Sequence, residues 1–143
     1  MNITQISVFL ENRKGRLADV CNLFGSNGVN IRALTIAETE TFGVMRLVVD
    51  KPSEAMELLK NNGFTANLTN IVAVEVEDIP GGLAKILNVL SVNQVNIEYM
   101  YGFIEKISEK ALMVFRFDNT EAAINVLAEN GVKFASKEDI QGL

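Results

Sequence analysis

The chain begins with two hydrophobic patterns in succession: an alternation of apolar and polar positions, and then the spacing of one face of a helix. Residues 3–10 form two alternating sets in a stretch rich in β-branched side chains, which predicts a strand. After the polar segment 11–15, apolar residues recur from Leu17 to Phe24 at the spacing of one helix face. Asn27-Gly28 supplies a left-handed stop, so we expect the helix to end there.

A hairpin and a second helix complete this first unit. Residues 31–39 and 44–49 are alternating runs joined by a short turn, which is typical of a hairpin. Pro52 suits the first turn of a helix, and Asn62-Gly63 suits its end. A short strand is expected near Phe64–Leu68. The order β-α-β-β-α-β predicts the ferredoxin-like unit, in which two helices cover one face of an antiparallel sheet.

The same pattern returns 66 residues further along the chain. Ten positions between residues 5 and 31 are identical to their counterparts: Val8/Val74, Glu11/Glu77, Gly15/Gly81, Leu17/Leu83, Ala18/Ala84, Asn22/Asn88, Asn27/Asn93, Val29/Val95, Asn30/Asn96 and Ile31/Ile97. After an insertion of two residues the shift becomes 68, and six more identities follow from Met45/Met113 to Gly63/Gly131. Such a period is the length of one small domain and is too long for a solenoid unit.

The second copy is expected to repeat every element of the first: strand Ile71–Val76, helix Leu83–Val92, strands Ile97–Ile104 and Ala111–Phe117, helix Thr120–Asn130 and strand Phe134–Ser136. The predicted fold class is therefore α+β, with two ferredoxin-like units of antiparallel sheet at residues 1–69 and 70–143. Only Thr69 and Asn70 lie between the copies, so we expect the two sheets to pair side by side.

Composition and charge narrow the range of partners. Hydrophobic residues make up 48% of the chain and charged residues 22%, values typical of a soluble globular protein. The apolar runs are too short to cross a bilayer and no signal-peptide pattern opens the chain, so we expect a cytoplasmic protein without a membrane partner. The net charge is −5, and the second copy carries all of it, because residues 1–70 are balanced. Neither nucleic acid nor anionic lipid is an expected partner.

The inventory of reactive side chains argues against catalysis. The chain has no histidine and one cysteine, so the usual nucleophilic, acid-base and zinc constellations have no members. Cys21 lies on a helix face and is interpreted as a structural thiol. We expect no cofactor and no metal. An enzyme that uses carboxylates and amides alone stays an alternative, and activity lost on Asp78→Ala would support it.

Two short motifs resemble nucleotide-binding or RNA-binding signatures without their context. Gly25-Ser26-Asn27-Gly28 has the spelling of a KH-domain loop, but it joins a helix to a strand and has no flanking basic residues. Gly81-Gly82 follows a strand and opens a helix, yet no glycine-rich fingerprint or Lys-Ser/Thr pair accompanies it. A helix start with free N–H groups also binds a carboxylate, which is the more useful interpretation here.

Each copy has a polar turn at the start of its first helix and an Asn-Ile pair at the start of the following strand. We expect donors and acceptors of the two segments to gather at one end of each copy. The candidate ligand-binding residues are Asn12, Arg13, Lys14, Gly15, Arg16 and Leu17 with Asn30 and Ile31, and Asp78, Ile79, Pro80, Gly81, Gly82 and Leu83 with Asn96 and Ile97. A structural interpretation stays open, in which the glycines make tight turns and the asparagines cap them.

These segments resemble the ACT domain, a small-molecule-sensing module of amino-acid metabolism. Its pattern is a strand, an Asn/Asp-x-Pro-Gly-x-Leu turn, a helix and a closing Gly-Val-Asn-Ile. The first copy has Asn12-Arg13-Lys14-Gly15-Arg16-Leu17 with Gly28-Val29-Asn30-Ile31, and the second has Asp78-Ile79-Pro80-Gly81-Gly82-Leu83 with Gln94-Val95-Asn96-Ile97. Lys14 stands where the pattern has proline, and Gln94 stands where it has glycine.

The resemblance implies that paired units bind a free amino acid across their interface. One site would then extend from Asn12 to Leu17 and face Asn96, and the other would extend from Asp78 to Leu83 and face Asn30. Basic residues make the first turn cationic, whereas Glu77 and Asp78 make the second anionic, so we expect unequal sites and one stronger site per chain.

The function that we expect is a non-catalytic amino-acid sensor that passes ligand occupancy to a partner by a change in its interface. The first copy, from Val8-Phe9-Leu10-Glu11-Asn12 through Asn30-Ile31-Arg32-Ala33-Leu34-Thr35, also resembles the small subunit of acetolactate synthase, although the second copy is another ACT unit rather than that subunit's usual C-terminal domain. An alternative is therefore a regulatory subunit of an amino-acid biosynthetic enzyme. A homodimer is expected, since the sheet face opposite the helices needs cover.

Overall fold

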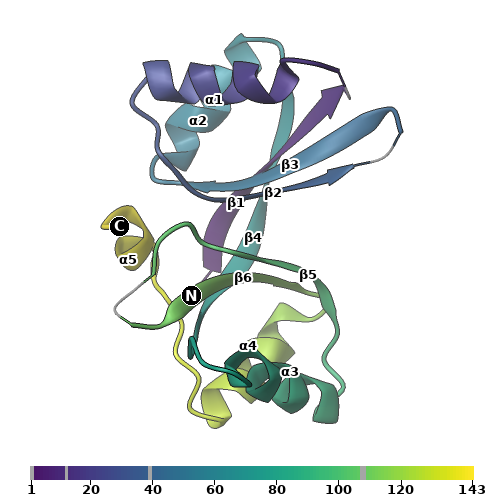
Figure 1. Ribbon diagram of the computed structural model, residues 1–143, viewed down its shortest axis with the longest axis vertical. Coiled ribbons are helices and arrows are strands. Elements are labelled where there is room, and N and C mark those ends of the chain that lie inside the picture. The colour runs from purple at the N-terminus through teal and green to yellow at the C-terminus, as the bar shows by residue number, and fades with distance from the viewer. Residues whose placement is uncertain (1, 12, 39, 107–108) are drawn as a thin grey trace. The chain divides into compact units, whose positions relative to one another are not determined.

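The computed structural model describes residues 2–11, 13–38, 40–106 and 109–143 (Figure 1). In chain order, the elements are β1 (Asn2–Glu11), α1 (Arg16–Ser26), β2 (Ile31–Glu38), β3 (Phe42–Val49), α2 (Pro52–Asn61), β4 (Thr65–Val76), α3 (Gly82–Val92), β5 (Ile97–Gly102), β6 (Ala111–Phe117), α4 (Thr120–Glu129) and α5 (Lys137–Gln141). Every helix among these residues is too short or too polar to span a membrane. The chain divides into two compact units, Thr4–Thr69 and Asn70–Leu143, and the start of β1 up to Ile3 groups with the second.

The first unit has the predicted β-α-β-β-α-β order. Its strands lie in the order β2-β3-β1-β4, and β3 pairs antiparallel with both β1 and β2. Figure 1 shows α1 and α2 together on one side of this sheet. Val20 and Phe24 of α1 and Leu59 of α2 pack with Ile6 and Val8 of β1 in one buried cluster, as the apolar spacing of the sequence predicts.

The second unit repeats this architecture with its own core. Its strands lie in the order β4-β6-β5, with β6 antiparallel to both neighbours. Ile86 and Leu90 of α3 and Leu127 of α4 pack against Val74 of β4 and Phe115 of β6. The expected α+β fold with two ferredoxin-like units is therefore confirmed.

The boundaries of two predicted strands were wrong. The sequence predicted separate strands on either side of Thr69 and Asn70, but β4 is one strand that serves as the last strand of the first unit and the first strand of the second. The physical reason is that this polar pair contains neither glycine nor proline, so nothing in it breaks an extended backbone.

The end of the chain also differs from the prediction. The expected strand Phe134–Ser136 is reduced to an isolated bridge between Val74 and Phe134, flanked by two backbone hydrogen bonds to β4. Ser136 then caps α5, because its hydroxyl accepts from the Asp139 N–H at 3.1 Å and the Asp139 carboxylate accepts from the Ser136 N–H at 2.9 Å. This capping box turns the chain into a helix that the sequence interpretation missed, although Ser-x-x-Asp is its known signature.

The ends of α1 to α4 share one local device. An asparagine Nδ2 donates to the carbonyl oxygen four residues earlier at 2.8 Å in each case, and these residues are Asn27, Asn62, Asn93 and Asn130. The following residue has a positive φ each time: Gly28, Gly63, Gln94 and Gly131. The predicted left-handed stops are therefore confirmed. In the described part of the chain, Gln94 is the one residue other than glycine that has a positive φ, at 58°.

Candidate functional site

The first candidate turn joins the end of β1 to the start of α1. Asn12 lies outside the described residues. Gly15 immediately precedes the helix with φ 86° and ψ −11°, a left-handed conformation that glycine adopts without steric cost. Gly15 has no side chain with which to cap the helix. The Arg16 N–H donates to the Arg13 carbonyl oxygen at 3.5 Å, and within the described residues the Leu17 and Ala18 N–H groups have no hydrogen-bond partner. This end of the helix can therefore donate to a bound anion.

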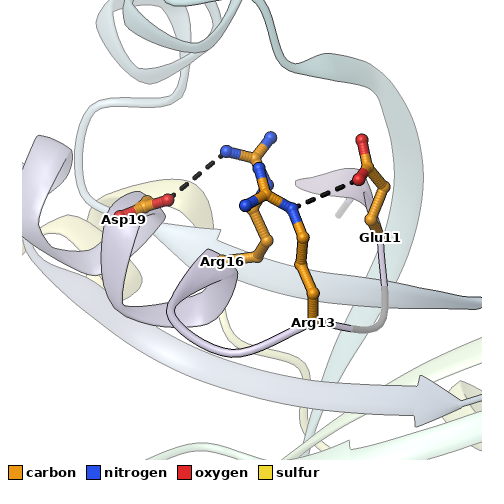
Figure 2. A network of polar contacts seen from close by, with 4 residues as sticks. All are labelled: Glu11, Arg13, Arg16 and Asp19. Atoms are coloured by element: carbon orange, nitrogen blue, oxygen red, sulfur yellow. Dashed lines mark hydrogen bonds and ion pairs between the residues drawn. The ribbon is translucent and has the colours of Figure 1, made fainter.

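Ion pairs compensate two of the three basic residues in this turn (Figure 2). Arg13 Nε lies 3.2 Å from Glu11 Oε2, and Arg16 Nη1 lies 3.4 Å from Asp19 Oδ2. The Arg16 guanidinium also stacks over the Phe64 ring at 4.5 Å from its centroid, and this side chain keeps only 21% of its surface exposed. Within the described residues, Lys14 is exposed and belongs to no ion pair.

The second candidate turn joins β4 to α3 and has the same backbone at its end. Gly81 has φ 84° and ψ −5°, and this glycine likewise has no side chain with which to cap the helix. The Gly82 N–H donates to the Ile79 carbonyl oxygen at 3.0 Å, which closes the turn. Gly82 is buried, and a β-carbon there would lie 2.0 Å from the Glu77 carbonyl oxygen. The second turn therefore requires glycine at 82, whereas the first carries Arg16 at the equivalent position.

The expected contrast of charge between the turns is smaller than composition suggests. Asp78 forms an ion pair with Lys106, a partner that sequence spacing did not indicate. Among the described residues, Glu77 enters no ion pair. The difference in sign thus rests on one uncompensated residue in each turn, Lys14 in the first and Glu77 in the second.

The Val-Asn-Ile segments begin β2 and β5. The Asn30 N–H donates to Asp50 Oδ1 at 2.8 Å, and the Asp50 N–H donates to the Asn30 carbonyl oxygen at 3.1 Å. The Asp118 N–H makes the equivalent bond to the Asn96 carbonyl oxygen at 3.2 Å. The backbone of each asparagine is held, while both residues are exposed. Among the described residues, neither Asn side chain makes a hydrogen bond.

The turn and the Val-Asn-Ile segment of one copy lie at opposite ends of its sheet, so the expectation that they gather at one end was wrong. On β3, Glu11 pairs with Phe42, whereas Ile31 pairs with Val49. These two partners are separated along the strand by about 23 Å, at about 3.3 Å per residue. The reason is that β1 and β2 are parallel, and a crossover helix returns the chain to the starting end of the sheet. The second copy repeats this arrangement along β6.

Cys21 fits the structural role that the sequence predicts. It lies on α1 and packs against the first buried cluster. Burial raises the pKa of the Cys21 thiol above its ordinary value of 9.0, so the thiol rather than the nucleophilic thiolate is favoured at neutral pH.

These features define a class of protein: a tandem of two ferredoxin-like α+β units. Each unit has a helix start behind a left-handed glycine and an exposed asparagine within a Val-Asn-Ile segment. Residues 1–143 match the family model described as an ACT domain pair. The chain therefore belongs to the ACT domain family, and the resemblance seen in the sequence is confirmed.

Solved structures share this fold. The crystal structure of protein BT0572 from Bacteroides thetaiotaomicron is 38% identical in sequence with a TM-score of 0.92, over 100% of this chain and 98% of that chain. The ligand-free regulatory subunit of aspartate kinase from Thermus thermophilus is 21% identical with a TM-score of 0.62, over 88% of this chain and 91% of that chain. At that identity the second likeness concerns the fold alone.

A curated relative is the acetolactate synthase small subunit of Buchnera aphidicola subsp. Baizongia pistaciae, which is 24% identical over 115 residues. The match covers 80% of this chain and 57% of that protein, so the chain spans little more than half of the relative's length. The chain is thus similar to a protein named as a small subunit of acetolactate synthase.

Proposed function

We propose that this protein is a non-catalytic regulatory protein that binds a free amino acid at the turns before α1 and α3. The observation that supports this proposal occurs in both copies: a helix start without a side-chain cap follows a left-handed glycine in an exposed turn. The N–H groups of the second and third residues of such a helix are donors for a carboxylate, because the first N–H already donates within the turn. Membership of the ACT family favours a regulatory role over a catalytic one.

The two turns are proposed to attract different ends of the ligand. Lys14 favours the carboxylate at the first turn, whereas Glu77 favours the ammonium at the second. Leu17 and Leu83 begin the helices beside the turns and would select among amino-acid side chains by size. We propose one stronger site per chain with micromolar to millimolar affinity, which corresponds to roughly −8 to −4 kcal/mol.

A ligand that touches both a turn and a Val-Asn-Ile segment needs two copies, because the two segments of one copy lie at opposite ends of its sheet. The proposal therefore joins the turn at 12–17 with Asn96 and the turn at 78–83 with Asn30. The second copy is either the other half of the same chain or half of a second molecule in a homodimer.

Calorimetry and thermal melting of the full chain with each of the twenty amino acids test the proposal. A ligand present at 100 times its Kd is expected to add about 2.7 kcal/mol to the free energy of unfolding.

Lys14→Gln is expected to weaken binding at the first turn about threefold, because one exposed charge contributes up to about 1 kcal/mol. Asn96→Ala is expected to weaken binding at the same site.

The control is Lys60→Gln, which removes an exposed lysine in the last turn of α2, outside residues 12–17 and 78–83 of the two turns. Equal affinities for Lys14→Gln, Asn96→Ala and Lys60→Gln would place the ligand elsewhere. The absence of both heat and a change in melting temperature with every amino acid would overturn the proposed function.

A second candidate is a regulatory subunit of an amino-acid biosynthetic enzyme such as acetolactate synthase. The similarity to the small subunit from Buchnera aphidicola favours it. Mixing the purified chain with the large, thiamine-diphosphate-dependent subunit tests it. Co-elution, and a change in the enzyme's inhibition by an amino acid, would support this candidate, whereas separate elution would contradict it.

A further inference from the structure

The hairpin formed by β5 and β6 contacts the second candidate turn. β4 leads into this turn, and its last residue, Val76, pairs with Ala111 at the start of β6. The hairpin and the turn therefore lie at the same end of the sheet of the second unit. Lys106, in the hairpin, forms an ion pair with Asp78 in the turn, and its Nζ donates to Asp78 Oδ2. A residue of the candidate ligand-binding segment is thus already engaged by a side chain of the same unit.

Lys106 brings to Asp78 the chemical group that an amino-acid ligand would bring. The lysine side chain ends in a primary ammonium group, which has three N–H donors and a positive charge. The amino end of a free amino acid is also a primary ammonium group at neutral pH. Two such groups repel each other when they approach one carboxylate. A ligand ammonium group therefore competes with Lys106 for Asp78.

The first copy carries neither member of this pair. The residue equivalent to Asp78 is the neutral Asn12, by the shift of 66. The hairpin segment 38–42 reads Glu-Thr-Glu-Thr-Phe and contains no lysine or arginine. The hairpin of the second copy is two residues longer, because the shift between the copies rises from 66 to 68 within it. The carboxylate and the lysine thus occur together in the second copy and are both absent from the first.

The exposure of the pair sets how strongly Lys106 can compete. The side chains of Lys106 and Asp78 keep 53% and 54% of their surface exposed. An ion pair in contact with solvent to this extent shifts an equilibrium constant by up to about fivefold. Lys106 therefore lowers the occupancy of Asp78 by another ammonium group, but a ligand can still displace it.

We infer that Lys106 is an autoinhibitory residue: it occupies Asp78 in the absence of ligand and lowers the affinity of the second turn for an ammonium group. A ligand that binds Asp78 releases the Lys106 side chain, so occupancy of the turn is coupled to the state of this side chain. This regulation rests on the proposed function, because the amino-acid ligand at the turn is taken from it. The hairpin segment 38–42 supplies no ammonium group, so the inhibition is confined to the second turn.

Chemical-shift titrations of the ¹⁵N-labelled full chain with each of the twenty amino acids test this role. The backbone amides of residues 15–18 report binding at the first turn, and those of residues 81–84 report binding at the second. Lys106→Met removes the ammonium group and keeps a long side chain. This variant is expected to bind the ligand about fivefold more tightly at the second turn, with an unchanged Kd at the first. In the background of Asp78→Asn, Lys106→Met is expected to have no effect.

The matched control is Lys110→Met, which makes the same change of charge directly before β6. Within the described residues, Lys110 enters no ion pair. The control is expected to change the Kd at the second turn less than twofold. Equal gains in Lys106→Met and Lys110→Met would show a general effect of charge and overturn the role of Lys106. An unchanged Kd at the second turn in Lys106→Met would overturn it as well.

Failure of this role and failure of the proposed function give different results. Binding at the first turn alone, in both the wild-type chain and Lys106→Met, would overturn the role of Lys106 and leave amino-acid binding intact. Shifts at neither turn in either protein, with every amino acid, would overturn both. Lys106 belongs to neither buried cluster, so the variant is expected to fold, and the dispersion of the same spectra verifies this.

Discussion

Single residues set the geometry of the second turn more strictly than that of the first. Gly82 and Arg16 occupy equivalent positions, yet only Gly82 lies against the backbone of its own turn. A larger residue at position 82 would clash with a carbonyl oxygen rather than with the end of a flexible side chain, so the turn itself would have to move. The identity of this residue is therefore a consequence of close approach, as at other glycines where two backbones meet.

Gly82→Ala is expected to lower the free energy of unfolding by about 3 kcal/mol, the size of other changes that force a backbone to shift. Gly25→Ala is the matched control, because Gly25 lies within α1 and a β-carbon there meets nothing within 4 Å. That change is expected to stabilise the chain by up to about 1 kcal/mol through helix propensity. Urea denaturation of the three proteins measures both effects, and equal stability of the two variants would contradict the structure of the turn.

Cys21 provides a pH-dependent prediction. Its folded-state pKa is raised above 9.0, because burial disfavours the thiolate. A raised pKa contributes stability that is fully present below the unfolded-state pKa and is lost as the pH rises through the folded-state value. We therefore expect the wild-type chain to lose more stability between pH 8 and pH 10.5 than Cys21→Ala does. Urea denaturation at both pH values checks this, and parallel losses would show that Cys21 is solvated.

Among the elements, the helices α1 to α4 end in one way. Each has an asparagine whose side chain donates back to the last turn, followed by a residue with positive φ. Three of those residues are glycines, which adopt this conformation freely, and the fourth is Gln94. The substitution leaves the hydrogen-bonding scheme of α3 unchanged but introduces strain at its end, since a β-carbon disfavours the left-handed region.

Gln94→Gly is expected to raise the free energy of unfolding by about 0.5 kcal/mol, as relief of about 1–2 kcal/mol of strain exceeds the entropy that glycine adds to the unfolded chain. Gly28→Gln makes the reverse change in the first copy and is expected to destabilise by a similar amount. Thermal melting of both variants against the wild-type chain measures the pair. A loss of stability in Gln94→Gly would mean that the glutamine side chain makes a compensating contact.

At the scale of the whole molecule, a duplicated unit has diverged in surface chemistry while its framework has stayed constant. The helix ends, the two uncapped helix starts and the buried clusters correspond between copies. The charges and the residues at 16 and 82 do not. Because the net charge of −5 belongs to the second copy, the copies present different fields to a ligand although their backbones are alike.

The amino-acid sequence was sufficient for the fold class, the order of elements, the helix stops and the family, because periodicity, turn residues and an internal repeat are local signals that need no knowledge of distant contacts. It was insufficient at β4, where an unbroken strand replaced two, and at α5, where a capping box redirected the chain. It also misplaced the turn relative to Asn30 and gave no sign of the Asp78–Lys106 and Arg16–Phe64 partnerships. Those features depend on which ends of parallel strands meet and which side chains approach across the fold, and such long-range geometry exists only once the chain has packed.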